Sequence, residues 1–246
     1  MPKAAKKRVQ APAPPLALAA KYLRESRDFA TGFLFILPLL VAYEVGIVVL
    51  RSRVINWAHG IIRLLFHTFG WAEPVLFGGL VAVLVVVAMA RAERFRIDLE
   101  LFGLMLAESV VYACALGLLC SFITRRLLAM AAGAASTLGS DIVLSIGAGV
   151  YEEILFRVAL LGALYYGLKR WTRLKPSMAM FIGIVVSSLA FSACHHIGPY
   201  GDPLELEPLV YRFWMGVAFA AVYVYRGLGI VVYTHALYDI FVSLGR

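Results

Sequence analysis

The chain has 246 residues, of which 62% are hydrophobic and 15% charged, with a mean hydropathy of +0.84 and a net charge of +8. A soluble domain has about a quarter charged residues, so this composition excludes an ordinary soluble protein and indicates a polytopic membrane protein. The basic residues lie at the amino terminus and between apolar runs, which is typical of membrane topology signals. We therefore expect a lipid bilayer around the chain and no nucleic acid as a partner.

Residues 1–28 form a basic leader with prolines at positions 12, 14 and 15. We expect its first part to be disordered and its second part to form a short helix at the membrane surface, where anionic lipids attract lysine and arginine. Its basic stretch is long and the apolar run after it is of spanning length, so we do not interpret it as a cleaved signal peptide. Residues 29–246 are then the transmembrane domain, with its motif-bearing core at 141–244.

Seven apolar segments are long enough to cross a bilayer, because about 20 residues that each rise about 1.5 Å cover its hydrocarbon core. They lie at residues 29–50, 74–90, 99–123, 141–167, 178–197, 209–225 and 228–244. The sequence thus predicts an all-α fold, a polytopic bundle of about seven to eight membrane helices that encloses an intramembrane cavity. An eighth crossing would lie within 124–140. Lysine and arginine are more numerous in the connections that would be cytoplasmic if the amino terminus were cytoplasmic. This bias predicts a cytoplasmic amino terminus.

An ionised side chain costs roughly 2.5–3.5 kcal/mol to insert at mid-membrane, and three of these segments carry ionisable residues that we interpret as functional. They are Glu152, Glu153 and Arg157 in the fourth segment, His195 at the end of the fifth, and His235 and Asp239 in the seventh. Glu153 and Arg157 are four residues apart, as are His235 and Asp239, so each pair shares one helix face. Glu152 points about 100° away from Glu153 in an α-helix. One glutamate can therefore pair with Arg157 while the other faces a cavity.

This combination of side chains suits hydrolysis. A carboxylate and an imidazole from different helices can hold a water molecule and remove its proton. A second imidazole with a short polar partner can stabilise the oxyanion that forms. Phe191 lies one helical turn before His195, where we expect it to pack and to shape the cavity.

The spacing of these residues resembles that of a known family. EEILFR at 152–157 is similar to its EExxxR motif, FSACH at 191–195 to its FxxxH motif, and HALYD at 235–239 to its HxxxN/D motif. The family is that of the CAAX proteases and bacteriocin-processing enzymes, named CPBP or Abi, which includes the type II CAAX prenyl endopeptidase. Each motif alone is short and arises by chance, but here the three occur in order in separate apolar segments.

The resemblance implies a role for each motif. It implies that Glu152 is the general base and that His195 positions the water with it. His235 and Asp239 would form the oxyanion site. The CAAX endopeptidase has asparagine where this chain has Asp239, and an ionised aspartate cannot donate a hydrogen bond to an oxyanion. Asp239 is then either protonated, or it orients His235 and keeps it cationic.

The resemblance implies that Glu153 and Arg157 are the supporting pair of the first motif, whereas the residues alone favour a structural ion pair that bridges helices. Further polar residues in apolar stretches have less specific interpretations. We expect Glu44 and Glu108 to be structural or to line a water path. The segment that holds His59 and His67 predicts an amphipathic helix at the membrane interface. The cysteines, at positions 114, 120 and 194, lie in apolar segments and favour packing over disulfides.

The sequence predicts no cofactor. Glu152, His195 and His235 are residues that ligate zinc, with Asp239 as a fourth or outer ligand. The usual zinc-peptidase signature HExxH is absent, however. We therefore favour a metal-free glutamate mechanism over a zinc mechanism.

These observations predict an intramembrane endopeptidase of a bacterial inner membrane. Its partner would be a membrane-anchored protein or peptide, cut near the membrane face and toward its carboxyl terminus. The expected topology opens the site toward the periplasmic half. The alternatives are a bacteriocin-immunity or peptide-binding protein without enzymatic activity and a proton-coupled transporter, since buried acids and histidines also serve proton relays. The sequence leaves the oligomeric state open.

Overall fold

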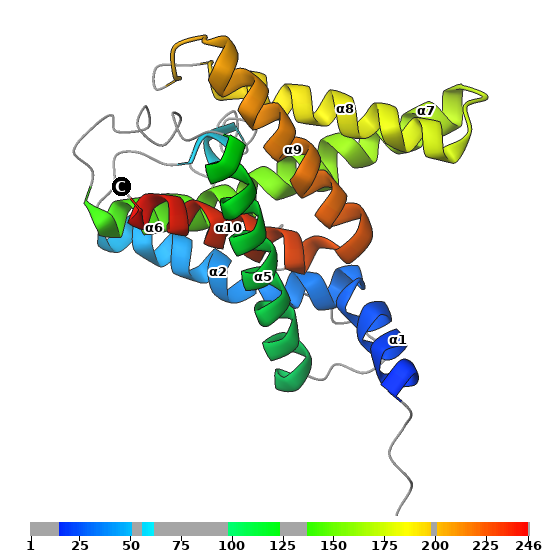
Figure 1. The fold of residues 1–246 in the computed structure, drawn as a ribbon, viewed down its shortest axis with the longest axis horizontal. Helices are drawn as coiled ribbons and strands as arrows, with labels where there is room; N and C mark the ends of the chain where they lie inside the picture. Colours follow the sequence, from blue (N-terminus) through cyan, green and yellow to red (C-terminus); the bar gives the residue numbers. More distant parts are fainter. Residues whose placement is uncertain (1–14, 51–55, 62–97, 124–136, 198–200, 246) are drawn as a thin grey trace, which may run out of the picture.

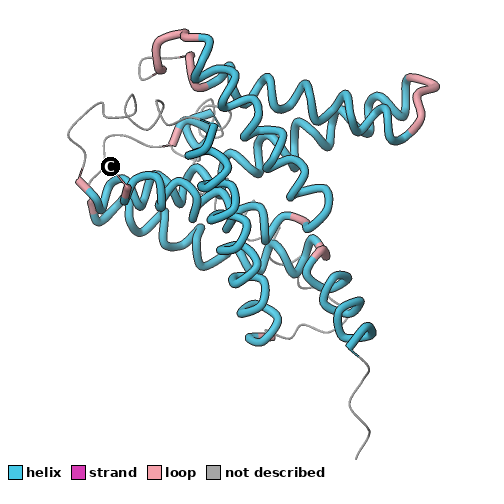
Figure 2. The backbone as a smooth tube through the Cα atoms, in the orientation of Figure 1, coloured by secondary structure: helices cyan, strands magenta, loops and turns pink. Residues whose placement is uncertain are grey.

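The structure is a computed structural model that describes residues 15–50, 56–61, 98–123, 137–197 and 201–245, with the backbone alone over 120–123. Every regular element within these ranges is helical (Figure 2), which confirms the predicted all-α fold. The expected membrane segment at 74–90, residues 124–136 of the possible eighth crossing and His67 lie outside the described residues.

Four of the described helices are long and apolar enough to cross a membrane. They are α2 (Phe29–Val49), α5 (Leu99–Ile123), α8 (Pro176–Cys194) and α9 (Leu206–Arg226). Helix α10 (Leu228–Leu244) is apolar but shorter, with 17 residues. All five agree with predicted segments to within a few residues. The chain is therefore an integral membrane protein.

The predicted segment 141–167 is one continuous helical run with an unexpected centre. It begins as α6 (Leu138–Gly147), becomes π-helical in η3 (Ala148–Glu152) and η4 (Ile154–Leu161), and ends as α7 (Gly162–Trp171). The expectation of a regular α-helix is wrong here. A π-helical turn holds more residues than an α turn, so neighbouring side chains diverge by a smaller angle, and such turns are frequent at functional sites. These two elements carry the first motif.

Helix α10 is central in the described bundle. It packs against α2, α5, α6, η3 and α9, and Figure 1 shows α2, α6 and α10 running side by side while α5 crosses them. Helices α7 and α8 lie together and away from α2, and α9 runs from the end of α8 to α10 (Figure 1). The helix of the basic leader, α1 (Pro15–Ser26), lies against α2 and α5.

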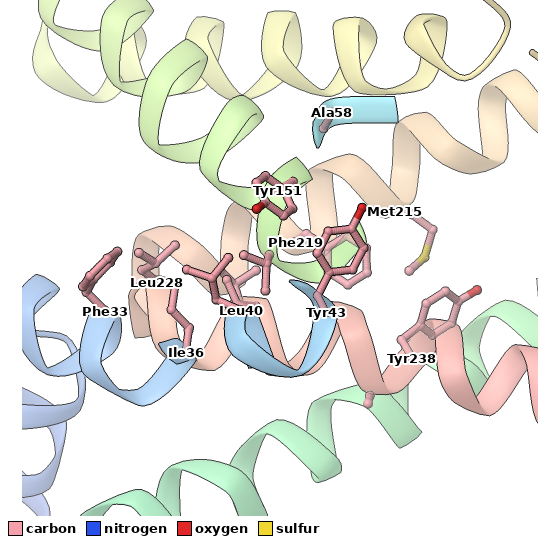
Figure 3. Close-up of a cluster of buried hydrophobic side chains, with 14 of the residues drawn as sticks. Phe33, Ile36, Leu40, Tyr43, Ala58, Tyr151, Met215, Phe219, Leu228 and Tyr238 are labelled. Carbon is pink, nitrogen blue, oxygen red and sulfur yellow. The ribbon is translucent and has the colours of Figure 1, made fainter. Parts of the chain in front are cut away.

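The main apolar core lies where α2 faces η3, α9 and α10. Phe33, Ile36, Leu40 and Tyr43 repeat at intervals of three and four residues, so they form one stripe along α2 (Figure 3). This stripe is buried against residues of the other elements, among them Tyr151 of η3. Large apolar side chains on the opposite faces of the helices are exposed in the described chain, as expected for contact with lipid.

Glu108 is part of a structural ion pair. The Nε and Nη2 atoms of Arg226 donate hydrogen bonds to its two carboxylate oxygens at 2.5 and 2.7 Å. The hydroxyl of Tyr22 also donates to this carboxylate, and Ser26 accepts from Arg226 at 3.1 Å. Burial and the neighbouring Glu108 carboxylate raise the pKa of Tyr22, so the phenol remains a donor. The cluster joins α1, α5 and the end of α9, which favours the structural interpretation of Glu108 over a water path.

Gly149 lets η3 approach the backbone of α10. A Cβ atom at this position would lie 2.7 Å from the carbonyl oxygen of Val232 and 2.8 Å from the amide nitrogen of Ala236. Both are backbone atoms inside a helix, so they cannot turn away as a side chain can. The motif residues Glu152 and His235 lie on these same two elements.

We predict that Gly149→Ala destabilises the bundle by about 1–3 kcal/mol, because the added methyl group overpacks the contact with α10. The measurement is thermal unfolding in a fixed detergent. Gly103→Ala on α5 is the matched control, since a Cβ atom there would meet nothing within 4 Å. That change should be neutral or stabilise by about 0.5–1 kcal/mol through helix propensity. Equal melting temperatures for the two variants would contradict the close approach.

Candidate active site

Glu153 and Arg157 form an ion pair that is completely buried. The Nε atom of Arg157 lies 3.0 Å from Oε2 of Glu153, and both side chains have 0% exposure. The Nη2 atom of Arg157 donates to the carbonyl oxygen of Gly216 on α9 at 3.4 Å, and the guanidinium lies over the ring of Phe191 on α8 at 4.9 Å. The predicted pairing is confirmed, and it ties η4 to two neighbouring helices.

His235 connects this ion pair to the second glutamate. Its Nδ1 atom lies 2.8 Å from Oε1 of Glu153, and because a carboxylate accepts, Nδ1 carries the hydrogen. The ring of Phe219 stacks on the imidazole at 4.2 Å. The Nε2 atom points to the other side, 3.5 Å from Oδ2 of Asp239 and 4.0 Å from Oε2 of Glu152. Both ends of the His235 ring are therefore next to acidic groups.

His195 follows the last residue of α8 and is oriented by its own helix. Its Nδ1 atom lies 2.7 Å from the carbonyl oxygen of Phe191. A carbonyl can only accept, so Nδ1 carries the hydrogen, and in the neutral ring Nε2 has a free lone pair. This Nε2 atom faces Oε2 of Glu152 at 3.8 Å. The amide of Asp202 donates to the carbonyl oxygen of His195 at 2.9 Å, which folds the following loop back onto this end of α8.

The four predicted catalytic residues thus meet at one place. Oε2 of Glu152 faces the Nε2 atoms of two imidazoles at 3.8 and 4.0 Å, and only 6% of this glutamate is exposed. These separations exceed a direct hydrogen bond but can be bridged by one water molecule. Residues from η3, the end of α8 and α10 are brought together, although they are far apart in the sequence.

His196, the neighbour of His195, has a different environment. Its Nδ1 atom lies 3.2 Å from the carbonyl oxygen of Asp202 and 2.9 Å from that of Pro203. Since carbonyls accept, His196 donates to the loop after α8. It therefore supports this loop.

Sequence reasoning missed two neighbours of the motif residues. The Nδ2 atom of Asn56 donates to Oε1 of Glu152 at 2.9 Å, although 96 residues separate them. Phe219 provides the stacked face of His235. Asn56 is the only asparagine in the chain, and a lone amide in an apolar sequence is a signal, but nothing local shows its partner. Phe219 resembles any other aromatic residue of a membrane helix.

His59, which the sequence places in a segment expected at the membrane interface, is buried within the bundle. This residue is 4% exposed, its Nδ1 atom lies 2.9 Å from the hydroxyl of Tyr43, and its ring stacks on Tyr151 at 4.4 Å. The described part of this segment, residues 56–61, therefore enters the bundle. The carboxylate of Glu44 accepts a hydrogen bond from the hydroxyl of Tyr151, which favours its structural interpretation.

Within the described residues, no group of three or more histidine, cysteine, aspartate and glutamate side chains has a geometry that would hold a metal ion. Cys114 and Cys194 are free thiols. The donor atoms that face one another are Oε2 of Glu152 and the two imidazole Nε2 atoms.

The comparison with protein families matches residues 134–241 to the type II CAAX prenyl endopeptidase Rce1-like family. This result confirms the resemblance found in the three motifs. Comparison with curated proteins found no match, and neither did comparison with solved structures. The Rce1-like segment contains every predicted catalytic residue, whereas Asn56 lies outside it. The family supports a protease of the CAAX type that acts in a membrane on peptide or protein substrates.

We predict that Arg157→Met destabilises the protein by roughly 3–5 kcal/mol, because it leaves the carboxylate of Glu153 buried without its cation. The measurement is thermal unfolding in detergent. Lys21→Met is the matched control, since Lys21 and Glu25 are also four residues apart but lie 3.9 Å from each other with the lysine 57% exposed. An exposed pair contributes little, so this variant should unfold like the wild type. Equal effects would show that burial does not decide the role of Arg157.

Proposed function

We propose that the protein is an intramembrane endopeptidase in which Glu152 removes a proton from the attacking water. The observation that carries this proposal is the position of Oε2 of Glu152, at 3.8 and 4.0 Å from the Nε2 atoms of His195 and His235. A general base must lie within reach of the proton that it removes, directly or through one water. The family of residues 134–241 supports the same class of reaction.

The two hydrogens of the water have two acceptors. Neutral His195 has its hydrogen on Nδ1, so its Nε2 accepts one hydrogen of the water, and Oε2 of Glu152 accepts the other. A lone pair of the oxygen is then directed at the scissile carbonyl carbon. As the carbon–oxygen bond forms, the proton passes to Glu152. When the tetrahedral intermediate collapses, Glu152 returns this proton to the amide nitrogen that leaves, and the carbon–nitrogen bond breaks.

His235 supplies the donor for the oxyanion. Its Nδ1–H is held by Glu153, so a proton on Nε2 makes the ring cationic and directs an N–H toward the side of Glu152 and Asp239. An imidazolium offsets part of the negative charge of these three carboxylates, of which Arg157 balances only one. Asp239 then orients His235, and the oxyanion receives its hydrogen bond from the imidazolium.

The substrate class proposed is a membrane-anchored protein or peptide that is cut near the membrane face, toward its carboxyl terminus. The location is proposed to be a bacterial inner membrane, with the amino terminus in the cytoplasm. The name of the family refers to prenylated substrates, and a prenyl group is a lipid anchor. A pair of probes that differ only in this group therefore separates recognition of the lipid from recognition of the peptide.

We predict that Glu152→Gln and His195→Ala each reduce cleavage by roughly 10²–10⁴-fold, because each removes an acceptor for the water. The protein is reconstituted in lipid nanodiscs with two fluorescent peptides, one with an S-farnesyl cysteine three residues before its carboxyl terminus and one with a single hydrophobic span. Release of the carboxyl-terminal fragment is followed by mass spectrometry.

Glu100→Gln, an exposed position at the start of α5, is the control and should cleave like the wild type. Undiminished cleavage by the Glu152→Gln variant would contradict the proposed mechanism. If instead the wild type cleaves neither probe, and both variants abolish protection against a bacteriocin or proton-coupled uptake, the non-enzymatic alternatives are correct.

We further propose that this reaction needs no metal ion. The proposal is supported by the absence of the zinc-peptidase signature HExxH from the sequence. We predict that exhaustive chelation leaves the cleavage rate within about twofold of the untreated rate, as expected if a protein carboxylate is the base. Elemental analysis of the purified protein accompanies the assay. Loss of activity that zinc alone restores would overturn this proposal.

A further inference from the structure

We propose that Asn56 is the positioning residue of Glu152, which fixes Oε1 so that Oε2 is the oxygen that accepts the proton. This inference rests on the proposed function. It starts from one contact, the hydrogen bond of 2.9 Å from Nδ2 of Asn56 to Oε1 of Glu152. Asn56 lies outside the segment that matches the Rce1-like family and outside all three motifs.

The orientation of the Asn56 amide follows from its other contacts. Its Oδ1 atom accepts hydrogen bonds from the amides of Ala58 at 2.9 Å and His59 at 3.4 Å, and it thereby caps the helical residues 57–61. An amide group has one oxygen and one nitrogen at opposite corners. Since the oxygen faces two N–H donors, the nitrogen must face Glu152, and the network assigns the amide without ambiguity.

The backbone of Asn56 is held by a buried tyrosine of α2. The amide of Asn56 donates to the hydroxyl oxygen of Tyr43 at 3.1 Å, and this hydroxyl lies 2.9 Å from Nδ1 of His59. Trp57 stacks on Phe156 of η4, with the rings 7° from parallel. The segment is therefore fixed to α2 on one side and to η4 on the other, which makes the amide a rigid support.

The contact has a direct consequence for Glu152. A buried carboxylate oxygen without a partner is costly, and a neutral amide satisfies Oε1 without adding a charge. The charged and titratable groups around Glu152 are His195 and Cys194 at the end of α8, His235 of α10 with Asp239 beside it, and Arg157 of η4. Both imidazoles face Oε2. Asn56 thus separates the two oxygens into one that is anchored and one that reacts.

Two substitutions separate this role from the helix cap. Serine and aspartate cap helices as well as asparagine does, so Asn56→Ser and Asn56→Asp keep the cap. Serine is too short to reach Glu152, and aspartate presents a carboxylate instead of a donor. We predict that both reduce kcat by roughly 10- to 100-fold, as expected for a displaced catalytic group, with KM within about twofold. In Asn56→Asp the acidic limb of the pH–rate profile also moves to higher pH, because a second carboxylate disfavours the ionised form of Glu152.

Cleavage of the two peptides in nanodiscs and thermal unfolding are measured on the same preparations. Asp28→Ser is the matched control, because Asp28 caps α2 through the amide of Thr31 far from the motifs. It should leave kcat and the pH–rate profile unchanged. If Asn56→Ser fails to fold, Asn56→Asp, which keeps both size and cap, carries the test.

The outcomes distinguish this inference from the proposed function. If Glu152→Gln abolishes cleavage while both Asn56 variants keep the kcat and pH–rate profile of the wild type, the role of Asn56 is wrong and the protease mechanism stands. If Glu152→Gln cleaves like the wild type, the protease mechanism itself fails. A loss of kcat in both Asn56 variants at unchanged melting temperature, with the shifted profile in Asn56→Asp, supports the positioning role.

Discussion

The buried charge of Arg157 is the constraint on which the rest of the site depends. A carboxylate in a membrane interior costs several kcal/mol unless a cation pairs with it, and Arg157 provides that cation for Glu153 at 3.0 Å. The other oxygen of Glu153, Oε1, accepts the hydrogen of His235 at 2.8 Å. The guanidinium also contacts the carbonyl of Gly216 and the ring of Phe191. One cation thereby fixes the relative positions of η4, α8, α9 and α10.

The two imidazoles of the site are distinguished by what their Nδ1 atoms contact. His195 donates to a carbonyl of its own helix, which is neutral, so the ring can remain neutral and offer a lone pair at Nε2. His235 donates to a carboxylate and has two further carboxylates on its other side, which favours a second hydrogen at Nε2. In the proposed mechanism, the same side chain therefore serves as an acceptor on α8 and as a donor on α10. The surroundings of the remote nitrogen decide this difference, as they commonly do for histidine.

The sequence predicts the parts of this site that depend on local spacing. Glu153 and Arg157 pair because they are four residues apart on one helix, and the membrane helices follow from the length of apolar runs. The π-helical centre at 148–161 was not predictable, because it accompanies the close contact of Gly149 with a helix more than 80 residues later in the sequence. The burial of His59 was not predictable for a similar reason. An aromatic stretch with histidines looks interfacial, and its burial is provided by Tyr43 and Tyr151 from other elements.

The charges around Asp239 account for an aspartate at a position where the CAAX endopeptidase has asparagine. An asparagine there would donate to an oxyanion directly, whereas Asp239 lies 3.5 Å from Nε2 of His235 and is partly exposed. With Glu152 and Glu153, it makes three carboxylates near one imidazole and one arginine. A cationic His235 reduces this excess of negative charge before substrate binds. An oxyanion would then receive its hydrogen bond from an imidazolium instead of an amide. Such a donor is charged, and hydrogen bonds from charged donors are roughly twice as strong as neutral ones. The replacement is therefore compatible with catalysis, provided that the positive charge resides on His235.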